Sequence, residues 1–242
     1  MKRTTRVSFI VLWMSMAVFI GNSIAKDMYF IGGDGNWTKA KALCFKAGWK
    51  VLEVREFDEL MKIGPNNNIL AFGDVNPERL MVLDKVLQNG AKIIWVACNV
   101  NNIQKVNDIS SDKFEFVIET DEIFKPIFKG NDISNLWNGL EVGIDRDCDT
   151  YPCKAHIKMF FATRNPSIEL AKYVNEKTNK AKVTSIKLIR GSGNAIIING
   201  PCSYRYEGFG QPSSLRGSIF LDKYIDQLDN EDAFKRLLEW HK

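Results

Sequence analysis

The chain has 242 residues, of which 45% are hydrophobic and 26% charged, and its formal net charge is +4. It carries no internal repeat, low-complexity tract, linker or basic block. This composition therefore argues against a repeat architecture and a nucleic-acid partner, and the length suits one globular domain.

The first 25 residues are predicted to be a signal peptide. Basic residues precede an uncharged apolar run over residues 7–21, and Ser23 and Ala25 place small side chains at a cleavage site. We expect cleavage near Ala25, a secreted or periplasmic mature protein with a net charge near +1, and no stable membrane anchor afterwards. The alternative is an uncleaved anchor, although the run is shorter than the roughly 20 residues of a membrane span.

The sequence contains five cysteines, and an oxidising compartment would permit disulfides between them. Cys148 and Cys153 are close in sequence and are predicted to form a disulfide, which would contribute about 2 kcal/mol. Cys44 lies on the apolar face of a predicted helix and is assigned to the core. Cys98 and Cys202 are either free or bridged to each other.

The N-terminal third alternates strands and helices. Residues 28–31 are predicted to form a strand, and Asn36 to cap a helix that Gly48 ends. The apolar positions of that helix recur at i, i+3, i+4 and i+7, the spacing of one helical face. Further strands are predicted over residues 51–54 and 69–72, the latter flanked by turn-forming sequences.

The next segments continue this alternation. Pro77 opens a predicted helix that Gly90 closes, and residues 92–97 form an apolar run typical of a strand covered on both faces. Residues 114–119 are predicted to form a strand, whereas residues 122–153 show no regular pattern.

The C-terminal third predicts a strand over residues 156–163, a helix over residues 166–178, and a hairpin of strands 183–190 and 195–199. A closing helix has an apolar face. The residues of that face are Phe234, Leu237, Leu238 and His241.

This order predicts an α/β protein: a flavodoxin-like three-layer sandwich with a mostly parallel sheet and an antiparallel extension. We expect one domain over residues 26–242, with an irregular insertion at about 103–153.

Four segments carry a resemblance to a known family. They are ALCFKAGWKVLEV, ILAFGDVNPERLMVLDKVLQNGAKIIWVA, GSGNAIIINGP and AFKRLLEWHK. Together they resemble the class I glutamine amidotransferase-like superfamily, and within it the non-catalytic members found in secreted bacterial proteins and beside glycoside hydrolase domains. The resemblance covers about two thirds of the mature chain and implies an amidotransferase-like domain.

Catalytic members of that superfamily place a cysteine on a sharp strand-to-helix turn between glycines, with His and Glu after the last core strand. Cys98 matches the position of the nucleophile, but Val96 and Val100 stand where small residues are needed. Gly-Pro-Cys follows strand 195–199 in place of His and Glu. The resemblance therefore does not predict glutaminase activity.

A ligand site is predicted at the carboxyl ends of the strands, where open α/β sheets bind their ligands. Aromatic, amide, carboxylate and guanidinium groups gather there, and they suit a sugar or a polar peptide. The candidate residues are Asp74, Asn99, Asn101, Tyr204, Arg205, Tyr206 and Glu207. The alternative is that the tyrosines pack beneath their loop and hold it in place.

Alternating carboxylates at Asp145, Asp147 and Asp149 suggest a calcium loop. However, Thr150 and His156 occupy the positions where an EF-hand needs Gly and Glu, so a solvated acidic loop is the preferred interpretation. We expect neither a metal nor another cofactor.

Three functions follow from these observations. The first is an exported, non-catalytic domain that binds a carbohydrate or a protein partner at the carboxyl edge of its sheet. The second is a cysteine-dependent hydrolase or transferase, with Cys98 as nucleophile and His156 as base. The third is a structural or assembly protein. The sequence leaves the oligomeric state and the ligand open.

Overall fold

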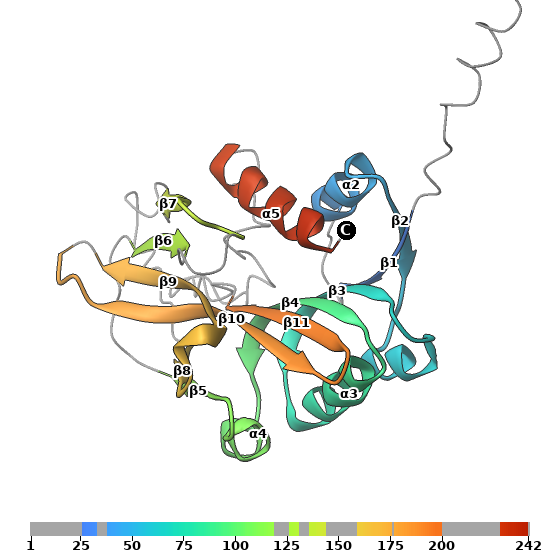
Figure 1. Cartoon of the computed structure of the whole chain (residues 1–242), viewed down its shortest axis with the longest axis horizontal. Helices are drawn as coiled ribbons and strands as arrows, with labels where there is room; N and C mark the ends of the chain where they lie inside the picture. Colours follow the sequence, from blue (N-terminus) through green and yellow to red (C-terminus); the bar gives the residue numbers. More distant parts are fainter. Residues whose placement is uncertain are drawn as a thin grey trace, which may run out of the picture.

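The computed structural model describes residues 26–32, 38–118, 126–130, 136–143, 159–175, 177–199 and 228–241 (Figure 1). The predicted signal segment over residues 1–25 lies outside these ranges. The described strands and helices, with η for 3-10 helices, are β1 (Lys26–Ile31), α2 (Thr38–Lys46), β2 (Trp49–Glu53), η1 (Phe57–Lys62), β3 (Asn68–Val75), α3 (Pro77–Gln88), β4 (Lys92–Val100), α4 (Ile103–Ser110), β5 (Phe114–Ile118), β6 (Pro126–Gly130), β7 (Glu141–Gly143), β8 (Met159–Thr163), η4 (Pro166–Ile168), β9 (Glu169–Asn175), β10 (Ala181–Arg190), β11 (Gly193–Asn199) and α5 (Leu228–Trp240).

The parallel part of the sheet has the order β2-β1-β3-β4-β11. This is the flavodoxin-like order, in which the chain passes from β1 outward to β2 and then returns to the other side of β1 with β3. α2 and α5 cover one face of this sheet, and α3 covers the other (Figure 1). The predicted three-layer α/β fold with a mostly parallel central sheet and added antiparallel strands is confirmed.

The antiparallel extension begins with the predicted hairpin of β10 and β11. Beyond β10 the sheet continues antiparallel through β9, β6 and β7. β10 also pairs with β8 at Val183, next to a register shift between Val183 and Ser185, and β8 pairs with β5. The sheet therefore divides at β10 into two antiparallel branches.

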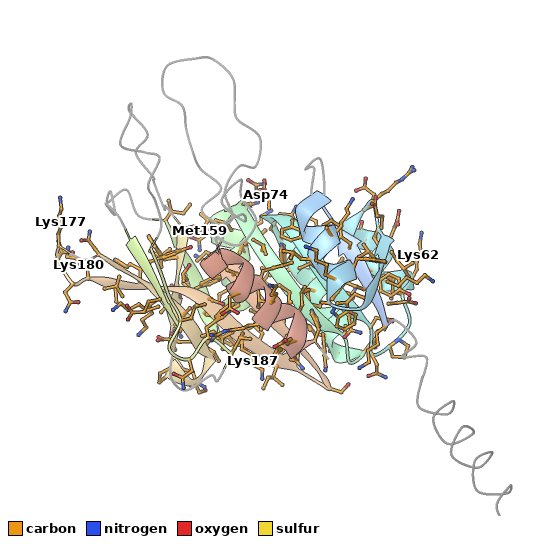
Figure 2. The ribbon with its side chains drawn as sticks, turned by 90° about the horizontal axis from the view of Figure 1, so that it is seen from above. Lys62, Asp74, Met159, Lys177, Lys180 and Lys187 are labelled. Atoms are coloured by element: carbon orange, nitrogen blue, oxygen red, sulfur yellow. The ribbon has the colours of Figure 1, made fainter. Side chains whose placement is uncertain are left out.

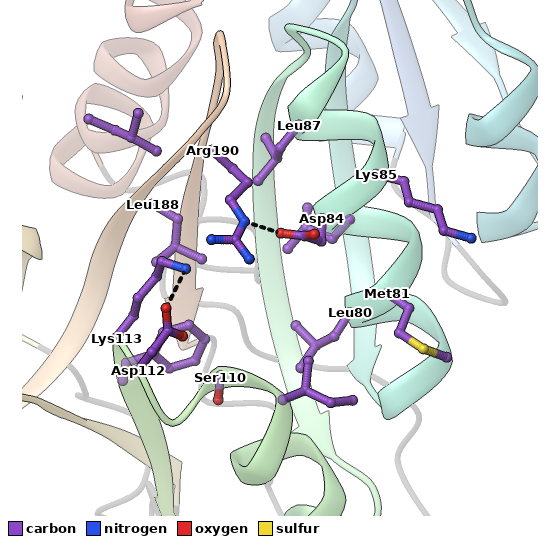
Figure 3. A pocket seen from close by; sticks show the side chains of 14 residues that line it. Leu80, Met81, Asp84, Lys85, Leu87, Ser110, Asp112, Lys113, Leu188 and Arg190 are labelled. Carbon is purple, nitrogen blue, oxygen red and sulfur yellow. Dashed lines mark hydrogen bonds and ion pairs between the residues drawn. The ribbon is translucent and has the colours of Figure 1, made fainter.

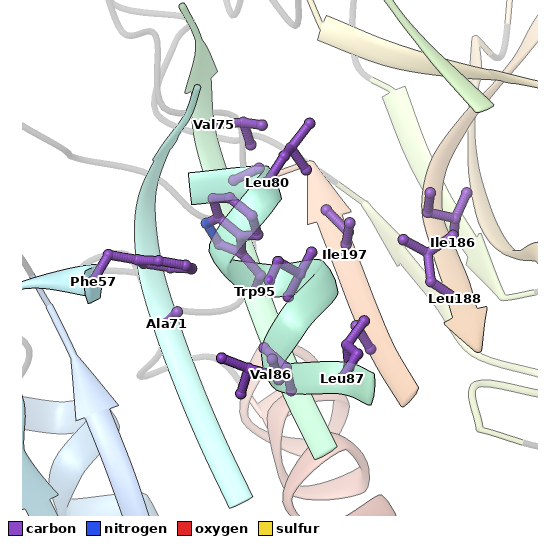
Figure 4. Close-up of a cluster of buried hydrophobic side chains, with 14 of the residues drawn as sticks. Phe57, Ala71, Val75, Leu80, Val86, Leu87, Trp95, Ile186, Leu188 and Ile197 are labelled. Carbon is purple, nitrogen blue, oxygen red and sulfur yellow. The ribbon is translucent and has the colours of Figure 1, made fainter. Parts of the chain in front are cut away.

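Alternate residues of the central strands pack into two separate hydrophobic cores, one on each face of the sheet. Leu70, Phe72 and Ile94 point toward α2 and α5, whereas Ala71 and Trp95 point toward α3 and η1 (Figure 4). Because successive side chains of a strand point to opposite faces, a strand covered on both faces must be apolar throughout. This accounts for the uninterrupted apolar run in β4.

α3 shows how the sequence sets the helix ends. Its N-cap is Asn76, whose side-chain oxygen accepts a hydrogen bond of 2.8 Å from the Arg79 amide, and Pro77 takes the first helical position. Gly90 follows with a φ of +88°, a left-handed conformation that favours glycine. Pro77 and Gly90 were the basis of the predicted helix ends, whereas Asn76 was not identified as the N-cap from the sequence.

The predicted helix over residues 166–178 is wrong. A short 3-10 helix, η4, is followed by the strand β9, which pairs with β10 on one side and β6 on the other. Leu170 and Tyr173, three residues apart, imitate the spacing of a helical face. Pairing with two neighbouring strands outweighs this local pattern, since strand formation depends strongly on tertiary context.

In the stretch 103–153, which was expected to be an irregular insertion, the structure describes α4, β5, β6 and β7. α4 was not predicted: it has only eight residues, of which Val106 and Ser110 are buried. No helix in the described part of the chain is both long and apolar enough to cross a membrane.

Candidate functional site

The carboxyl ends of β1 and β3 lie at the point where the strand order reverses. In flavodoxin-like sheets this switch point forms the crevice that receives a ligand. β3 ends there with Gly73, Asp74 and Val75, and Figure 2 shows where Asp74 lies in the molecule. Residues at this end of β3 therefore occupy the position where the fold binds ligands.

Asp74 and Asn101 come from neighbouring strand ends and contact each other. The Asn101 side-chain amide donates a hydrogen bond of 3.1 Å to Oδ2 of Asp74, and the Asn101 backbone N–H donates one of 2.7 Å to the Val75 carbonyl. Asp74 is half-buried and Asn101 is exposed. The structure thus brings together two of the predicted ligand residues.

Arg79 supports Asp74 from the first turn of α3. Its Nη1 donates a hydrogen bond of 2.8 Å to the backbone carbonyl of Asp74, and its guanidinium lies 5.5 Å from the centre of the Phe57 ring. Because Asn76 holds the backbone of Arg79 at the same time, the arginine is fixed at both ends. The Asp74 backbone is therefore attached to a rigid helix end.

A bulge turns the end of β3 toward this site. The pairing of β3 with β4 shifts register between Gly73 and Val75, and Gly73 has a φ of +141°. The indole N–H of Trp95 donates a hydrogen bond of 3.2 Å to the Gly73 carbonyl. Bulges re-aim side chains beside functional sites, and here the bulge lies next to the Asp74 carboxylate.

The carboxylate and amide together suit a ligand that carries hydroxyl or N–H groups. A carboxylate accepts hydrogen bonds, and an amide both donates and accepts them. Such a pair recognises neighbouring hydroxyls of a sugar or the backbone of an extended peptide. Among the described residues, no group of three or more His, Cys, Asp or Glu side chains is placed to hold a metal ion.

The supporting residues were not identified from the sequence. Pro77 predicted a helix start, but nothing in the sequence indicated that Arg79 would bind the Asp74 carbonyl or that Phe57 would pack under the Arg79 guanidinium. Phe57 belongs to η1, a 3-10 helix that the sequence did not predict. These contacts depend on the tertiary placement of η1 and α3.

Cys98 lies inside a strand. β4 continues through it to Val100, and the left-handed residue that precedes α4 is Asn102, with a φ of +56°. The strand had been predicted to end at Ala97, which would have placed Cys98 at the turn. The strand-to-helix turn instead falls after Val100, beyond the position of the candidate nucleophile.

The other predicted site residues are located as follows. Asn99 is a residue of strand β4. Cys44 is buried in the core, and burial raises the pKa of its thiol to about 12. The remaining predictions lie outside the described residues. These are the ligand residues Tyr204, Arg205, Tyr206 and Glu207, the base His156, the carboxylates Asp145, Asp147 and Asp149, the disulfide pair Cys148 and Cys153, and Cys202.

In sequence comparisons, no protein family and no curated protein matches the chain. Among solved structures, the mmIFT52 N-terminal domain is 12% identical, with a TM-score of 0.52 and coverage of 89% of this chain and 97% of that one. At this identity the similarity concerns the fold alone.

Two other solved structures are more weakly similar. A Thermoplasma acidophilum protein, provisionally described as a GMP synthase subunit, is 11% identical with a TM-score of 0.45, over 90% of this chain and 94% of that one. Gan42B, a GH42 β-galactosidase, is 10% identical with a TM-score of 0.40, over 72% of this chain and 27% of the enzyme.

Proposed function

We propose that this chain is an exported, non-catalytic, amidotransferase-like domain that binds a carbohydrate or a protein partner at the carboxyl edge of its sheet. The observation that carries the proposal is the Asp74–Asn101 pair, which joins two strand ends beside the switch point. A carboxylate and an amide held side by side can bind a polar ligand through hydrogen bonds, and such binding requires no nucleophile.

The export half of the proposal rests on the sequence of residues 1–25. It is tested by expressing the full chain in a bacterial host and determining the N-terminus of the product by mass spectrometry. A mature chain that starts near Lys26 in the periplasm or medium supports export, and an intact N-terminus contradicts it.

The binding half is tested on an array of polysaccharides and peptides with the wild-type protein and the variants Asp74→Asn and Asn101→Ala. We expect both variants to lose at least about tenfold in affinity, because each removes one partner of a polar contact to the ligand. Asp58→Asn, the same change at an exposed position of η1, is the matched control. A ligand that binds both site variants as tightly as the wild type would place the binding site elsewhere.

The enzyme alternative requires Cys98 to be an activated thiolate. Peptide-mapped alkylation between pH 5 and 9 distinguishes the two functions, because only a thiolate of lowered pKa reacts quickly near pH 6. We expect slow labelling of Cys98, and buried Cys44 is the internal standard for an inert thiol. Fast labelling near pH 6 would favour the hydrolase or transferase.

A further inference from the structure

An apolar groove lies between α3, the α4–β5 turn and β10, away from the residues of the Asp74 site. Its volume is about 240 Å³. The buried residues Leu80, Leu188 and Phe114 contribute to its apolar lining, as does the half-exposed Ile109, and the half-exposed Met81 stands at its rim (Figure 3). The groove is smaller than the roughly 300–1,000 Å³ of a typical drug-sized site, so it suits a small molecule.

The polar end of the groove is formed by two ion pairs. Nε of Arg190 lies 2.5 Å from Oδ1 of Asp84, and Nζ of Lys113 lies 3.0 Å from Oδ2 of Asp112 (Figure 3). The hydrogen bond from Lys113 lowers the pKa of the Asp112 carboxyl, with a smaller contribution from Arg190. Both carboxylates therefore already have a cationic partner.

At this end of the groove, both carboxylate oxygens of Asp84 already accept hydrogen bonds, whereas Arg190 keeps N–H groups that can still donate. The second oxygen of Asp84 accepts a hydrogen bond of 2.8 Å from the Gln88 side chain, so both of its oxygens are occupied. The two Nη groups of Arg190 make no hydrogen bond with any described residue. A guanidinium with spare N–H groups recognises a carboxylate well, because its planar fork matches the two carboxylate oxygens.

We propose that this groove binds a small aliphatic carboxylic acid, with the carboxylate on the Nη groups of Arg190 and the alkyl chain over Leu80, Leu188 and Phe114. Surplus donors beside an apolar floor are complementary to a molecule that has one anionic end and one apolar end. This site goes beyond the proposed function, because none of Asp74, Asn76, Arg79 and Asn101 lines the groove.

The test is isothermal titration calorimetry of the purified protein with decanoate, kept below its micelle concentration, and with decanol. Both probes offer the same tail, but only decanoate offers the charge. We expect decanoate to bind at least about tenfold more tightly than decanol, and Arg190→Gln to abolish this difference. Arg190→Gln is expected to fold normally, since the side chains of Arg190 and Asp84 are 44% and 39% exposed and ion pairs at the surface contribute little to stability.

A charge reversal at the rim locates the site independently. Met81→Glu places an anion beside the ligand and should weaken decanoate binding at least about fivefold, whereas Met81→Lys should not weaken it. Met61→Glu, the same change at an exposed methionine of η1, is the control. Asp74→Asn should leave decanoate binding unchanged, which separates this site from the proposed function.

Three results would overturn the proposal. The first is no measurable heat with millimolar decanoate. The second is equal affinity for decanoate and decanol. The third is an equal loss of affinity in Met61→Glu and Met81→Glu, which would place the ligand outside the groove.

Discussion

Gly73 shows how a single residue supports the candidate site. Its φ of +141° lies in a region that L side chains rarely adopt, and a Cβ there would lie 3.0 Å from Nη1 of Arg79. The same Nη1 donates to the Asp74 carbonyl. A side chain at position 73 would therefore strain the backbone there, and it would also crowd the Arg79 guanidinium that donates a hydrogen bond to the Asp74 carbonyl.

We expect Gly73→Ala to lower the free energy of unfolding by roughly 1–3 kcal/mol, because the new residue must hold a strained φ. Urea denaturation followed by tryptophan fluorescence measures this change. Gly64→Ala is the matched control, since a Cβ at Gly64 meets only the Asn67 side chain, at 3.9 Å. An equal loss of stability in the two variants would contradict the assigned role of Gly73.

At the scale of elements, the sequence predicted most of the parallel sheet correctly. β3, α3 and β4 were identified because Pro77 and Gly90 mark the helix ends and a doubly covered strand is continuously apolar. These signals are local in the sequence, and they are enough to predict an element that buries one whole face or both faces.

The errors and omissions fall where partners distant in sequence decide the structure. Residues 166–178 combine good helix formers with apolar residues three apart, yet β9 forms because β10 and β6 flank it. At the candidate site, the positions of Asp74 and Asn101 at strand ends were predictable. The Arg79–Asp74 contact was not, because it needs the bulge at Gly73 and the packing of Phe57.

The closing helix α5 provides a prediction at the same scale. Phe234, Leu237 and Leu238 are fully buried against the core under α2 and α5. Leu237→Ala should lower the free energy of unfolding by about 2–5 kcal/mol, because it removes apolar contacts and leaves a cavity. Glu239→Ala, on the exposed side of α5, should change it by less than about 0.5 kcal/mol. Thermal and urea denaturation of both variants test this difference.

At the scale of the whole molecule, His241 couples stability to pH. Its side chain is 1% exposed beside Trp49 and Trp240, and burial, followed by the nearby Lys92 ammonium, lowers its pKa to about 3. The unfolded chain, in which the pKa is near 6.5, therefore binds a proton more readily than the folded chain. The stabilisation is fully present above pH 6.5 and is lost as the pH falls toward 3.

Between pH 7 and pH 5 this linkage predicts a loss of about 2 kcal/mol in the free energy of unfolding, in a range where carboxylates contribute little. His241→Phe should remove most of this slope. The control is His156→Gln, which changes the only other histidine. Urea denaturation at several pH values measures the slope, and an unchanged slope in His241→Phe would show that another group is responsible.

The sheet order also determines when the protein can fold during its synthesis. β4 pairs with β11, about one hundred residues later, and Nζ of Lys92 lies 3.4 Å from the carbonyl of His241, which is 149 residues away. Translation must therefore pass residue 199 before β4 gains its second neighbour, and residue 240 before α5 covers its face of the sheet. Until then the nascent polypeptide exposes Met28, Phe30 and Leu70, a surface that a chaperone would recognise. A stop codon that removes only α5 should accordingly yield an aggregating product, even though it deletes no strand.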